Sequence, residues 1–311
     1  MFSNNIDLNN FNQQKYIIQN ITSINVHNYS INSVKTFPSG NIISVSNDKS
    51  IKIFDGKLFT IIQNIKNAHN NWIFYVEIID EKNFITCSGD NNIKTWKKIN
   101  NEYELNKIIK NAHNSWINKV IYCSNENLIS CSNDKTVKIW EEKNYKYQII
   151  NILKHSNSII SILLLEDKNI LVSVGKDEIK FWNIEKIKNI KLINSFKNVD
   201  CNCWNGLERI NDNQIIIGGD ESIRIIMFTE EKIIKEIYIP FNVWCVKIIL
   251  HKNLIFVAGE SNDILIYRID NFEKIKIIKN AHTKWIKGFN LINDNLIASY
   301  SFDNVIKIWS I

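Results

Sequence analysis

Histidine, aspartate and a hydroxyl residue recur in this chain at a fixed spacing, and these three residue types can do chemistry together. In hydrolases they supply a nucleophile, its general base and the group that orients the base, and elsewhere they ligate metals. The histidine precedes the aspartate by 21 positions in four places and by 22 in a fifth, and the hydroxyl residue stands four before the aspartate. The five sets are His27, Ser44 and Asp48; His69, Thr86 and Asp90; His113, Ser130 and Asp134; His155, Ser173 and Asp177; and His282, Ser299 and Asp303.

A tryptophan joins four of these sets. Trp96, Trp140 and Trp309 follow the aspartate by six positions and Trp182 by five, while the first set has Phe54. A buried imidazole and a buried indole N–H each need a hydrogen-bond partner, and a linked network avoids leaving one unpaired. A catalytic group more often breaks a repeat than obeys it. The recurrence therefore favours a structural network over an active site.

Other signs of catalysis are missing from the sequence. It contains no G-x-x-x-x-G-K-[ST] for phosphates and no H-E-x-x-H for zinc. Cys201 and Cys203 form a C-x-C pair without a second Cys/His cluster at zinc-ligand spacing, and the six cysteines are too irregular for a disulfide framework. Cys87 and Cys131 stand where other copies have valine or isoleucine, which predicts small core residues. We expect no enzyme activity, no cofactor and no metal site.

The composition is that of an ordinary globular protein, with 45% hydrophobic and 23% charged residues among 311. The net charge of +6 comes from scattered lysines, without the basic run typical of a nucleic-acid arm. The N-terminus lacks the features of a secretory signal, and no apolar run is long enough to cross a membrane. We expect a soluble cytoplasmic protein, with a nuclear location also open, that does not insert into membranes.

A repeat of about 43 residues organises the whole chain, and it must position the residues above. Successive acids are separated by 42, 44, 43, 43, 40 and 43 positions, with Glu260 or Asp263 as the acid of the sixth copy. The others are Asp48, Asp90, Asp134, Asp177, Asp220 and Asp303. Seven copies of one unit predict a single domain over 14–311, preceded by a poorly ordered extension at 1–13.

Each copy has the alternating, β-branched pattern of short strands and no sustained helical period. In the third copy four strands are expected at about 116–122, 127–132, 136–140 and 145–152. The chain ends without residues for a fourth strand in the seventh copy, and residues 14–21 have the pattern of that missing strand. We therefore predict an all-β ring of seven four-stranded antiparallel units, closed by the N-terminal strand.

The period, the histidine at the start of each unit, the aspartate before the third strand and the tryptophan that closes it resemble the WD40 repeat. This resemblance implies a seven-bladed β-propeller in which the four residue types form a hydrogen-bonded tetrad inside the blade. Some features depart from the family pattern: no copy has the Trp-Asp dipeptide, and the sequence has only 9 glycines. Copies five and six lack the histidine, hydroxyl and tryptophan and carry Ile216 and Phe256 at the hydroxyl position.

Large aromatic residues near the start of each unit are the candidate binding residues. Position four after the histidine is isoleucine in five copies, and alternation sends positions three and five to the other side. The resemblance to WD40 proteins implies that these two positions lie near the mouth of the central channel, where partners bind. The aromatic candidates are Trp72, Phe74, Trp116, Trp204, Trp244 and Trp285, with Ser30 and Ser158 as gaps. The turn residues before each acid, Asn47, Gly89, Asn133, Lys176, Gly219, Gly259 and Phe302, are expected at the outer rim.

The function predicted from these features is a non-catalytic scaffold that binds a protein or peptide segment at the channel mouth, as a monomeric subunit of a larger complex. An aromatic mouth suits an extended peptide, including one that inserts a lysine or arginine by cation–π contact. The alternative for the aromatics is packing between blades. The alternatives for the protein are a nucleic-acid-binding propeller that uses its basic surface and a propeller enzyme, although the first strands are poor in carboxylates.

Overall fold

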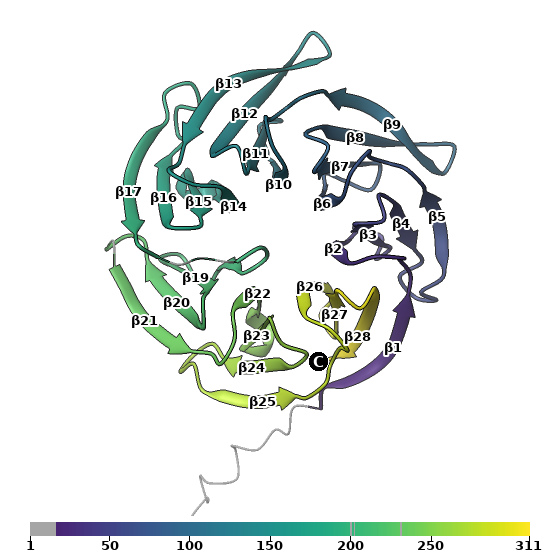
Figure 1. Ribbon diagram of the computed structural model, residues 1–311, viewed down its shortest axis with the longest axis vertical. Helices are drawn as coiled ribbons and strands as arrows, with labels where there is room; N and C mark the ends of the chain where they lie inside the picture. Colours follow the sequence, from purple (N-terminus) through teal and green to yellow (C-terminus); the bar gives the residue numbers. More distant parts are fainter. Residues whose placement is uncertain (1–16, 200, 202, 231) are drawn as a thin grey trace, which may run out of the picture.

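Short runs of isoleucine, valine and aromatic residues form the strands of this protein, which a computed structural model describes at residues 17–199, 201, 203–230 and 232–311. The described residues form seven four-stranded antiparallel sheets, or blades, arranged in a ring (Figure 1). In this part of the chain no helix is long and apolar enough to span a bilayer. The expected extension at 1–13 lies outside the described residues.

The first four blades follow one another along the chain, each running from an inner to an outer strand. Blade one contains β2 (Ile31–Thr36), β3 (Ile42–Ser46), β4 (Ile51–Phe54) and β5 (Ile61–Ile65). Blade two contains β6 (Ile73–Ile78), β7 (Asn83–Ser88), β8 (Ile93–Ile99) and β9 (Glu102–Ile109). Blade three contains β10 (Ile117–Tyr122), β11 (Leu128–Ser132), β12 (Thr136–Lys143) and β13 (Lys146–Lys154). Blade four contains β14 (Ile159–Leu165), β15 (Ile170–Gly175), β16 (Glu178–Asn183) and β17 (Lys191–Lys197), with the 3-10 turn η2 (Glu166–Lys168) between its first two strands.

The last three blades complete the ring. Blade five contains β18 (Leu207–Arg209), β19 (Gln214–Gly219), β20 (Ser222–Met227) and β21 (Lys232–Tyr238). Blade six contains β22 (Val243–Ile249), β23 (Leu254–Gly259), β24 (Ile264–Arg268) and β25 (Lys274–Ile278), with the 3-10 turn η3 (Leu250–Lys252) after β22. Blade seven contains β26 (Ile286–Asn293), β27 (Leu296–Ser301), β28 (Val305–Ser310) and the N-terminal strand β1 (Gln19–Asn25). The four strands expected in the third copy and the seven-bladed ring are thus confirmed.

The N-terminal strand closes the ring, as predicted, but its position along the chain is different. β1 covers Gln19–Asn25 instead of 14–21, and it pairs antiparallel with β28 at the far end of the chain. Most of its side chains are exposed, so its hydrophobic pattern does not determine its ends. The ends of β1 are instead determined by its pairing with β28, because the backbone N–H and C=O groups of β28 need partners along the outer edge of the blade.

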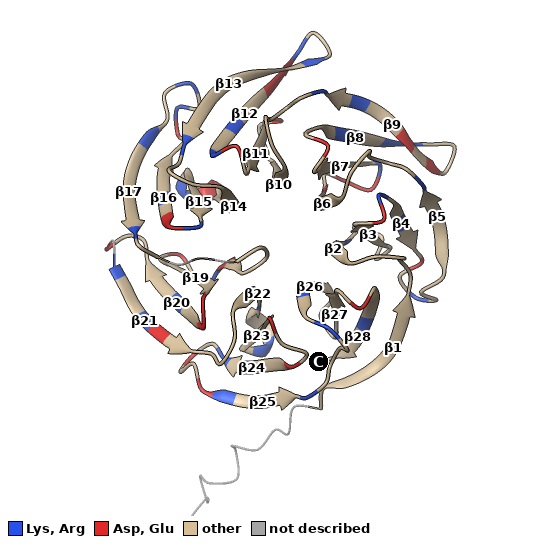
Figure 2. Ribbon diagram, viewed as in Figure 1, with Lys and Arg blue, Asp and Glu red and all other residues tan. Residues whose placement is uncertain are grey.

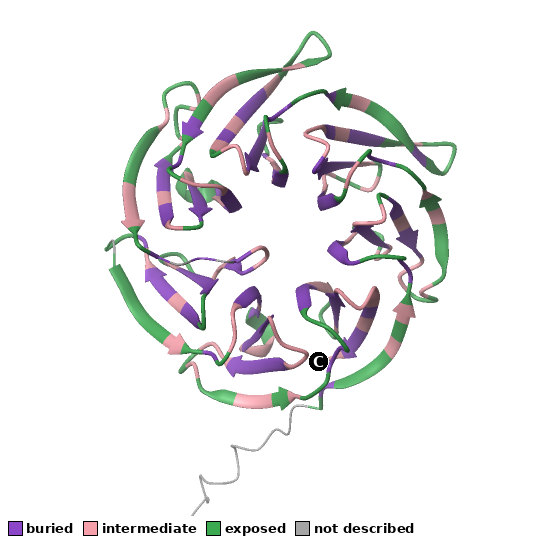
Figure 3. Ribbon diagram, viewed as in Figure 1, coloured by how far each residue is buried: buried purple, intermediate pink, exposed green. Residues whose placement is uncertain are grey.

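The hydrophobic core consists of layers between neighbouring blades. Ile43 and Val45 of blade one, for example, belong to one cluster with Ile73, Phe84 and Trp96 of blade two. Figure 3 shows the consequence, with buried inner strands and mostly exposed outer strands. Each blade therefore contributes both faces to the core, as a radial repeat requires.

In five blades the turn before the third strand contains a left-handed residue, and none of the five is glycine. The residue after the acid has positive φ in five blades: Lys49 (66°), Asn91 (65°), Lys135 (69°), Glu221 (47°) and Asn304 (69°). Asparagine, at two of these positions, tolerates this conformation better than most residues because its short polar side chain can hydrogen-bond locally, whereas lysine and glutamate adopt it at the other three. The tight turn is thus preserved although the sequence contains few glycines.

Candidate interaction surface

In blades two, three and seven, a hydrogen-bonded tetrad holds the start of the inner strand against the turn that carries the acid. In blade three the Trp140 indole N–H donates to Ser130 Oγ at 2.9 Å, and Ser130 Oγ lies 2.8 Å from His113 Nε2. His113 Nδ1 lies 2.8 Å from Asp134 Oδ2. If His113 is neutral with its proton on Nδ1, it donates to Asp134 and accepts from the Ser130 hydroxyl, so each hydrogen bond has one donor and one acceptor. The predicted network, and its structural role for His113, are confirmed.

The same contacts recur in other blades. In blade two His69 joins Asp90 (2.9 Å) to Thr86 (2.8 Å), and Trp96 donates to Thr86. Blade seven repeats them with His282, Asp303, Ser299 and Trp309. In blade one His27 bridges Asp48 and Ser44, both at 2.8 Å, and Phe54 replaces the indole.

Blade four departs from the prediction, because Glu178 instead of Asp177 is the acid beside its histidine, and His155 Nδ1 makes no hydrogen bond among the described residues. His155 Nδ1 lies 3.1 Å from Glu178 Oε1, whereas Asp177 accepts from the Ser156 hydroxyl at 3.3 Å. The turn is one residue shorter here, since Val174 faces Ile179 while its equivalent Cys131 faces Val137. Because the turn is shorter, the side chain of Glu178, the residue after Asp177, lies beside the His155 imidazole.

Burial and pairing shift the proton affinities within the tetrads. Burial lowers the pKa of His27, His69 and His113, and it lowers the pKa of His155 to about 4. Burial alone would raise the pKa of Asp303, but hydrogen bonds from His282 and two backbone amides outweigh it and lower that pKa to about 2. His27, His69 and His113 are therefore neutral at neutral pH, and the aspartates beside them are charged.

A β-bulge interrupts the inner strand directly above each tetrad. In blade three Ile117 faces Ser132 and Lys119 faces Cys131, so Asn118 is the extra residue between them. Bulges at the same place occur in blades one, two, four, six and seven. A bulged residue re-aims its side chain. The fifth residue after the histidine is consequently turned into the structure, and Phe74, Asn118 and Trp244 are all buried.

Where the third residue after the histidine is tryptophan, its side chain remains exposed. Trp72 is 41% exposed, Trp116 is 39% exposed and Trp285 is 48% exposed. Each also accepts, through its backbone oxygen, a hydrogen bond from the turn residue of its own blade: Gly89, Asn133 and Phe302, respectively. The three indoles thus occupy equivalent places on one end of the ring.

The aromatic candidates form two connected groups. Trp72 and Trp116 have ring centroids 5.7 Å apart, and Phe74 lies 5.5 Å from Trp116 and 6.3 Å from Trp204. In the second group, Trp244 lies 5.3 Å from Trp285 and 5.7 Å from Phe302. Phe74 belongs to blade two and Trp204 to the segment that leads into blade five, so this contact crosses the ring.

In the described part of blade five, the pairing of β18 with β19 shows no bulge. Leu207 faces Ile217 as Lys119 faces Cys131, and the Gly218 N–H donates to Gly206 O. The ring of Trp204, just before these residues, is half-buried.

Blade six needs a correction of one residue. Val246 faces Val257, so Val257 instead of Phe256 stands at the hydroxyl position, and Ser261 instead of Glu260 or Asp263 at that of the acid. The backbone N–H of Glu260 donates to Asn242 O, as that of Asn133 donates to Trp116 O. Glu260 thus takes the rim position assigned to Gly259. The turn η3 adds a residue before β23 and causes the shift.

The other rim residues lie beside the aromatic groups. The backbone N–H groups of Asn47 and Lys176 donate to Ser30 O and Ser158 O, as in the blades that carry tryptophan. Asn47, Asn133 and Phe302 are half-buried, and Lys176 is exposed. These residues therefore surround the same end of the ring as the indoles.

Lys287 joins the two aromatic groups, and sequence reasoning missed it. Its Nζ lies 4.8 Å from the centroid of Phe302 and 5.3 Å from that of Trp204, and it donates to Asn32 Oδ1 at 3.0 Å. No carboxylate of the described residues pairs with it, and burial lowers its pKa to about 8. The sequence does contain one indication of its role: Lys287 stands five positions after His282, where every other copy with a histidine has a neutral residue.

Charges deeper in the ring are paired across blades. Glu77 of β6 lies 3.6 Å from Lys35 of β2, and Glu208 of β18 lies 2.8 Å from Lys247 of β22. The inner strands therefore hold carboxylates, but each has a lysine beside it. Across the described ranges, no three His, Cys, Asp or Glu side chains come together as a metal site requires. Figure 2 shows both signs of charge interspersed around the ring.

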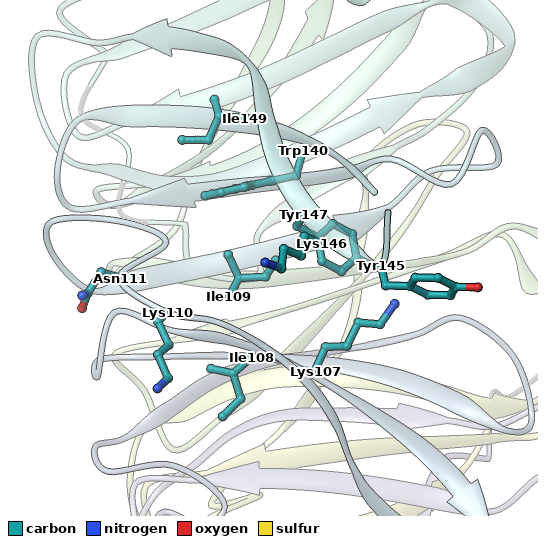
Figure 4. A pocket seen from close by; sticks show the side chains of 10 residues that line it. All are labelled: Lys107, Ile108, Ile109, Lys110, Asn111, Trp140, Tyr145, Lys146, Tyr147 and Ile149. Carbon is teal, nitrogen blue, oxygen red and sulfur yellow. The ribbon is translucent and has the colours of Figure 1, made fainter. Parts of the chain in front are cut away.

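A separate groove of about 560 Å³ lies on the outer side of the ring, between β9 and the β12–β13 hairpin. Figure 4 shows Lys107, Lys110 and Lys146 around it, with Trp140 and Tyr147 on its wall. Lys107 forms an ion pair with Glu142. The groove is distinct from the end of the ring that carries the exposed indoles.

Comparisons with known proteins agree with the repeat. The family model described as "WD domain, G-beta repeat" matches residues 18–55 and 105–141. Lissencephaly-1 homolog 1 of Paramecium tetraurelia is 36% identical over 78 residues, which are 25% of this chain and 19% of that protein. The chain thus matches less than a fifth of the length of this relative.

WD40 propellers generally mediate protein–protein interactions and are typically non-catalytic. Both matched segments end with the third strand of a blade and begin in the outer strand of the blade before it. The closed ring of seven blades and the networks built on His27, His69, His113 and His282 agree with these matches, so the chain is a seven-bladed β-propeller with WD40 repeats at residues 18–55 and 105–141.

Proposed function

We propose that this propeller is a non-catalytic platform that binds a segment of a protein partner at the end of the ring bearing the indoles. The observation that carries the proposal is the exposure of Trp72, Trp116 and Trp285 at equivalent positions of three blades. Exposed clusters of large apolar side chains mark interaction sites, and tryptophan is enriched among interface hot spots.

The platform is rigid before a partner arrives. The tetrad of blade three holds the turn whose Asn133 N–H donates to Trp116 O at 2.9 Å. Phe74 supports Trp72 and Trp116 from below, with centroid distances of 6.3 and 5.5 Å. Little side-chain freedom remains to be lost on binding, which favours affinity.

The shape of the surface favours an extended peptide. The two aromatic groups are bridged at the middle by Lys287, so a bound segment can contact both. Ser30 and Ser158 leave gaps in the aromatic series, and Asn47, Asn133, Lys176 and Phe302 offer polar and apolar contacts at the rim. We further propose that the protein acts in the cytoplasm, as a monomeric subunit that recruits its partner into a larger complex.

Affinity capture from the native cell tests this function. Trp116→Ala should weaken partner capture by at least about 2 kcal/mol, the hot-spot scale, while the melting temperature stays almost unchanged. Tyr145→Ala is the matched control, because Tyr145 is an aromatic residue that is 87% exposed in the β12–β13 hairpin, away from the indoles. Equal capture by both variants, or a large loss of melting temperature in Trp116→Ala, would overturn the proposal.

A further inference from the structure

Asn32 and Asn118 are equivalent residues with equivalent amide contacts. Each stands on the bulge, five residues after the histidine of its blade. Asn32 Nδ2 donates to Asn47 Oδ1 (2.6 Å) and Ile73 O (2.7 Å), and Asn118 Nδ2 donates to Asn133 Oδ1 (2.8 Å) and Ile159 O (2.7 Å). Because a backbone oxygen accepts from each Nδ2, the orientation of both amides is determined, and both Oδ1 atoms are left for other donors.

Only one of these two oxygens has a donor within the described chain. Asn32 Oδ1 accepts from Lys287 Nζ at 3.0 Å. Asn118 Oδ1 has no hydrogen-bond partner among the described residues, although Asn118 is only 4% exposed. A buried acceptor without a donor costs about 1–3 kcal/mol. The cost is recovered if a ligand supplies the donor.

The residue of the preceding blade explains the difference. Lys287 stands on the bulge of blade seven and donates to the next blade, one. Phe74 stands on the bulge of blade two, before blade three, and a phenyl ring has no donor. Gly89 leaves room for that ring, since a Cβ there would lie 3.3 Å from Phe74 Cε2. Blade three therefore lacks the cation that blade one receives.

Other lysines nearby are engaged elsewhere. Lys119 Nζ lies over the Tyr75 ring at 5.3 Å, and Lys35 Nζ lies over the same ring at 5.0 Å. The aromatic surroundings that hold Lys287 are nevertheless repeated beside Asn118. Lys287 lies against Trp204 and Phe302, and Trp204 also lies 6.3 Å from Phe74, which contacts Trp116.

We propose that the partner segment carries a lysine or arginine that donates to Asn118 Oδ1 and lies against Phe74 and Trp116. The partner would thus supply to blade three what Lys287 supplies to blade one. Cation–π attraction to two rings adds to the hydrogen bond. The proposal rests on the proposed function and names the chemistry that the surface recognises.

The test uses blocked amino acids as probes. Nα-acetyl methylamides of arginine, lysine, citrulline and glutamate are titrated into the full chain, with the tryptophan indole N–H signals followed by NMR. The arginine or lysine probe should shift the Trp116 signal, and citrulline, a neutral isostere of arginine, should bind at least about tenfold more weakly. The arginine and lysine arms distinguish the two basic side chains. A shift by glutamate alone would place an acidic ligand at Lys287 and overturn the proposal.

Two matched variants separate recognition from folding. Asn118→Leu and Asn32→Leu each remove the same two Nδ2 hydrogen bonds, from blade three and blade one, respectively. Asn118→Leu should lose at least about tenfold in affinity for the basic probe, and Asn32→Leu should stay within about threefold. Equal losses in both variants would show an indirect structural effect and refute the proposal.

A third variant supplies the donor from the chain itself. Phe74→Lys reproduces the arrangement of Lys287 with Asn32, so it should block the basic probe and melt at least about 2 °C above Phe74→Leu. No probe binding together with no stability gain in Phe74→Lys would overturn the inference. If Trp116→Ala abolishes partner capture while Asn118→Leu does not, the interaction function stands and only the basic-residue proposal fails.

Discussion

Trp72 and Trp116 stand at the same position of successive blades, and their exposed rings touch at a centroid distance of 5.7 Å. The contact unites two blades into one aromatic surface. Trp285 has the same position in blade seven but belongs to the group of Trp244 and Phe302. The seven-fold repeat therefore places the indoles, and the neighbours decide which of them act together.

The contact predicts non-additive effects on partner affinity. Trp72→Ala and Trp116→Ala should show a coupling free energy of about 0.5–1.5 kcal/mol, since removal of either ring alters the packing of the other. Trp72→Ala and Trp285→Ala should be additive within about 0.5 kcal/mol. Partner affinities of the single and double variants provide both cycles, and a coupling near zero for the first pair would contradict the prediction.

The tetrads predict unequal effects of one substitution in two blades. Ser130→Ala leaves both His113 Nε2 and the Trp140 N–H without partners, whereas Ser44→Ala affects only His27 Nε2, because Phe54 has no N–H. At about 1–3 kcal/mol for each buried unpaired group, Ser130→Ala should lower the free energy of unfolding by about 2–6 kcal/mol and Ser44→Ala by about half as much. Urea unfolding measures both, and equal losses would argue against the linked network.

Blade four offers a direct test of which acid pairs with its histidine. Glu178 is buried, contacts His155 and Lys180, and accepts from the Ser156 N–H at 2.8 Å. Glu178→Gln should lower the free energy of unfolding by about 1–3 kcal/mol, while Asp177→Asn should stay within about 0.5 kcal/mol. Urea unfolding of the pair checks this prediction. The opposite order would restore Asp177 to the tetrad.

Acidification should destabilise the fold in two stages. Burial lowers the pKa of His155 from 6.5 to about 4, and it also lowers the pKa of His27, His69 and His113. Below pH 6.5 the unfolded chain therefore binds more protons than the folded one, so stability falls with pH by up to about 1.4 kcal/mol per unit for each such histidine. For His155 this loss ends near pH 4.

The second stage comes from the carboxylates. Hydrogen bonds that outweigh burial lower the pKa of Asp303 to about 2, and the pKa of Asp48 and Asp134 is also lowered, so their contributions are lost only as pH falls below about 4. Urea midpoints at pH 7.5, 5.5 and 4.5 test the first stage. His155→Gln should show a shallower decline than the parent, and a flat profile for the parent from pH 7.5 to 4.5 would contradict the assignment.

Local pattern predicted the elements with high accuracy where each repeat unit is regular. The recurrence of His113, Ser130, Asp134 and Trp140 at fixed spacing was enough to infer the tetrad, because the same backbone geometry returns in each blade. It failed where one residue is gained or lost. In blade four a shortened turn places Glu178 instead of Asp177 beside the histidine. In blade six the turn η3 adds one residue, so Ser261 stands at the position of the acid.

The sequence by itself determined the seven-fold repeat, the all-β fold and the closing role of the N-terminal strand, because these follow from local periodicity and the count of strands. Tertiary structure alone decided which aromatics are exposed, since the bulge turns Phe74 and Trp244 inward and leaves Trp72, Trp116 and Trp285 outside. It also brought Lys287 to Asn32 and left the equivalent Asn118 oxygen without a donor. Contacts between blades depend on residues far apart in the chain, and no local spacing encodes them.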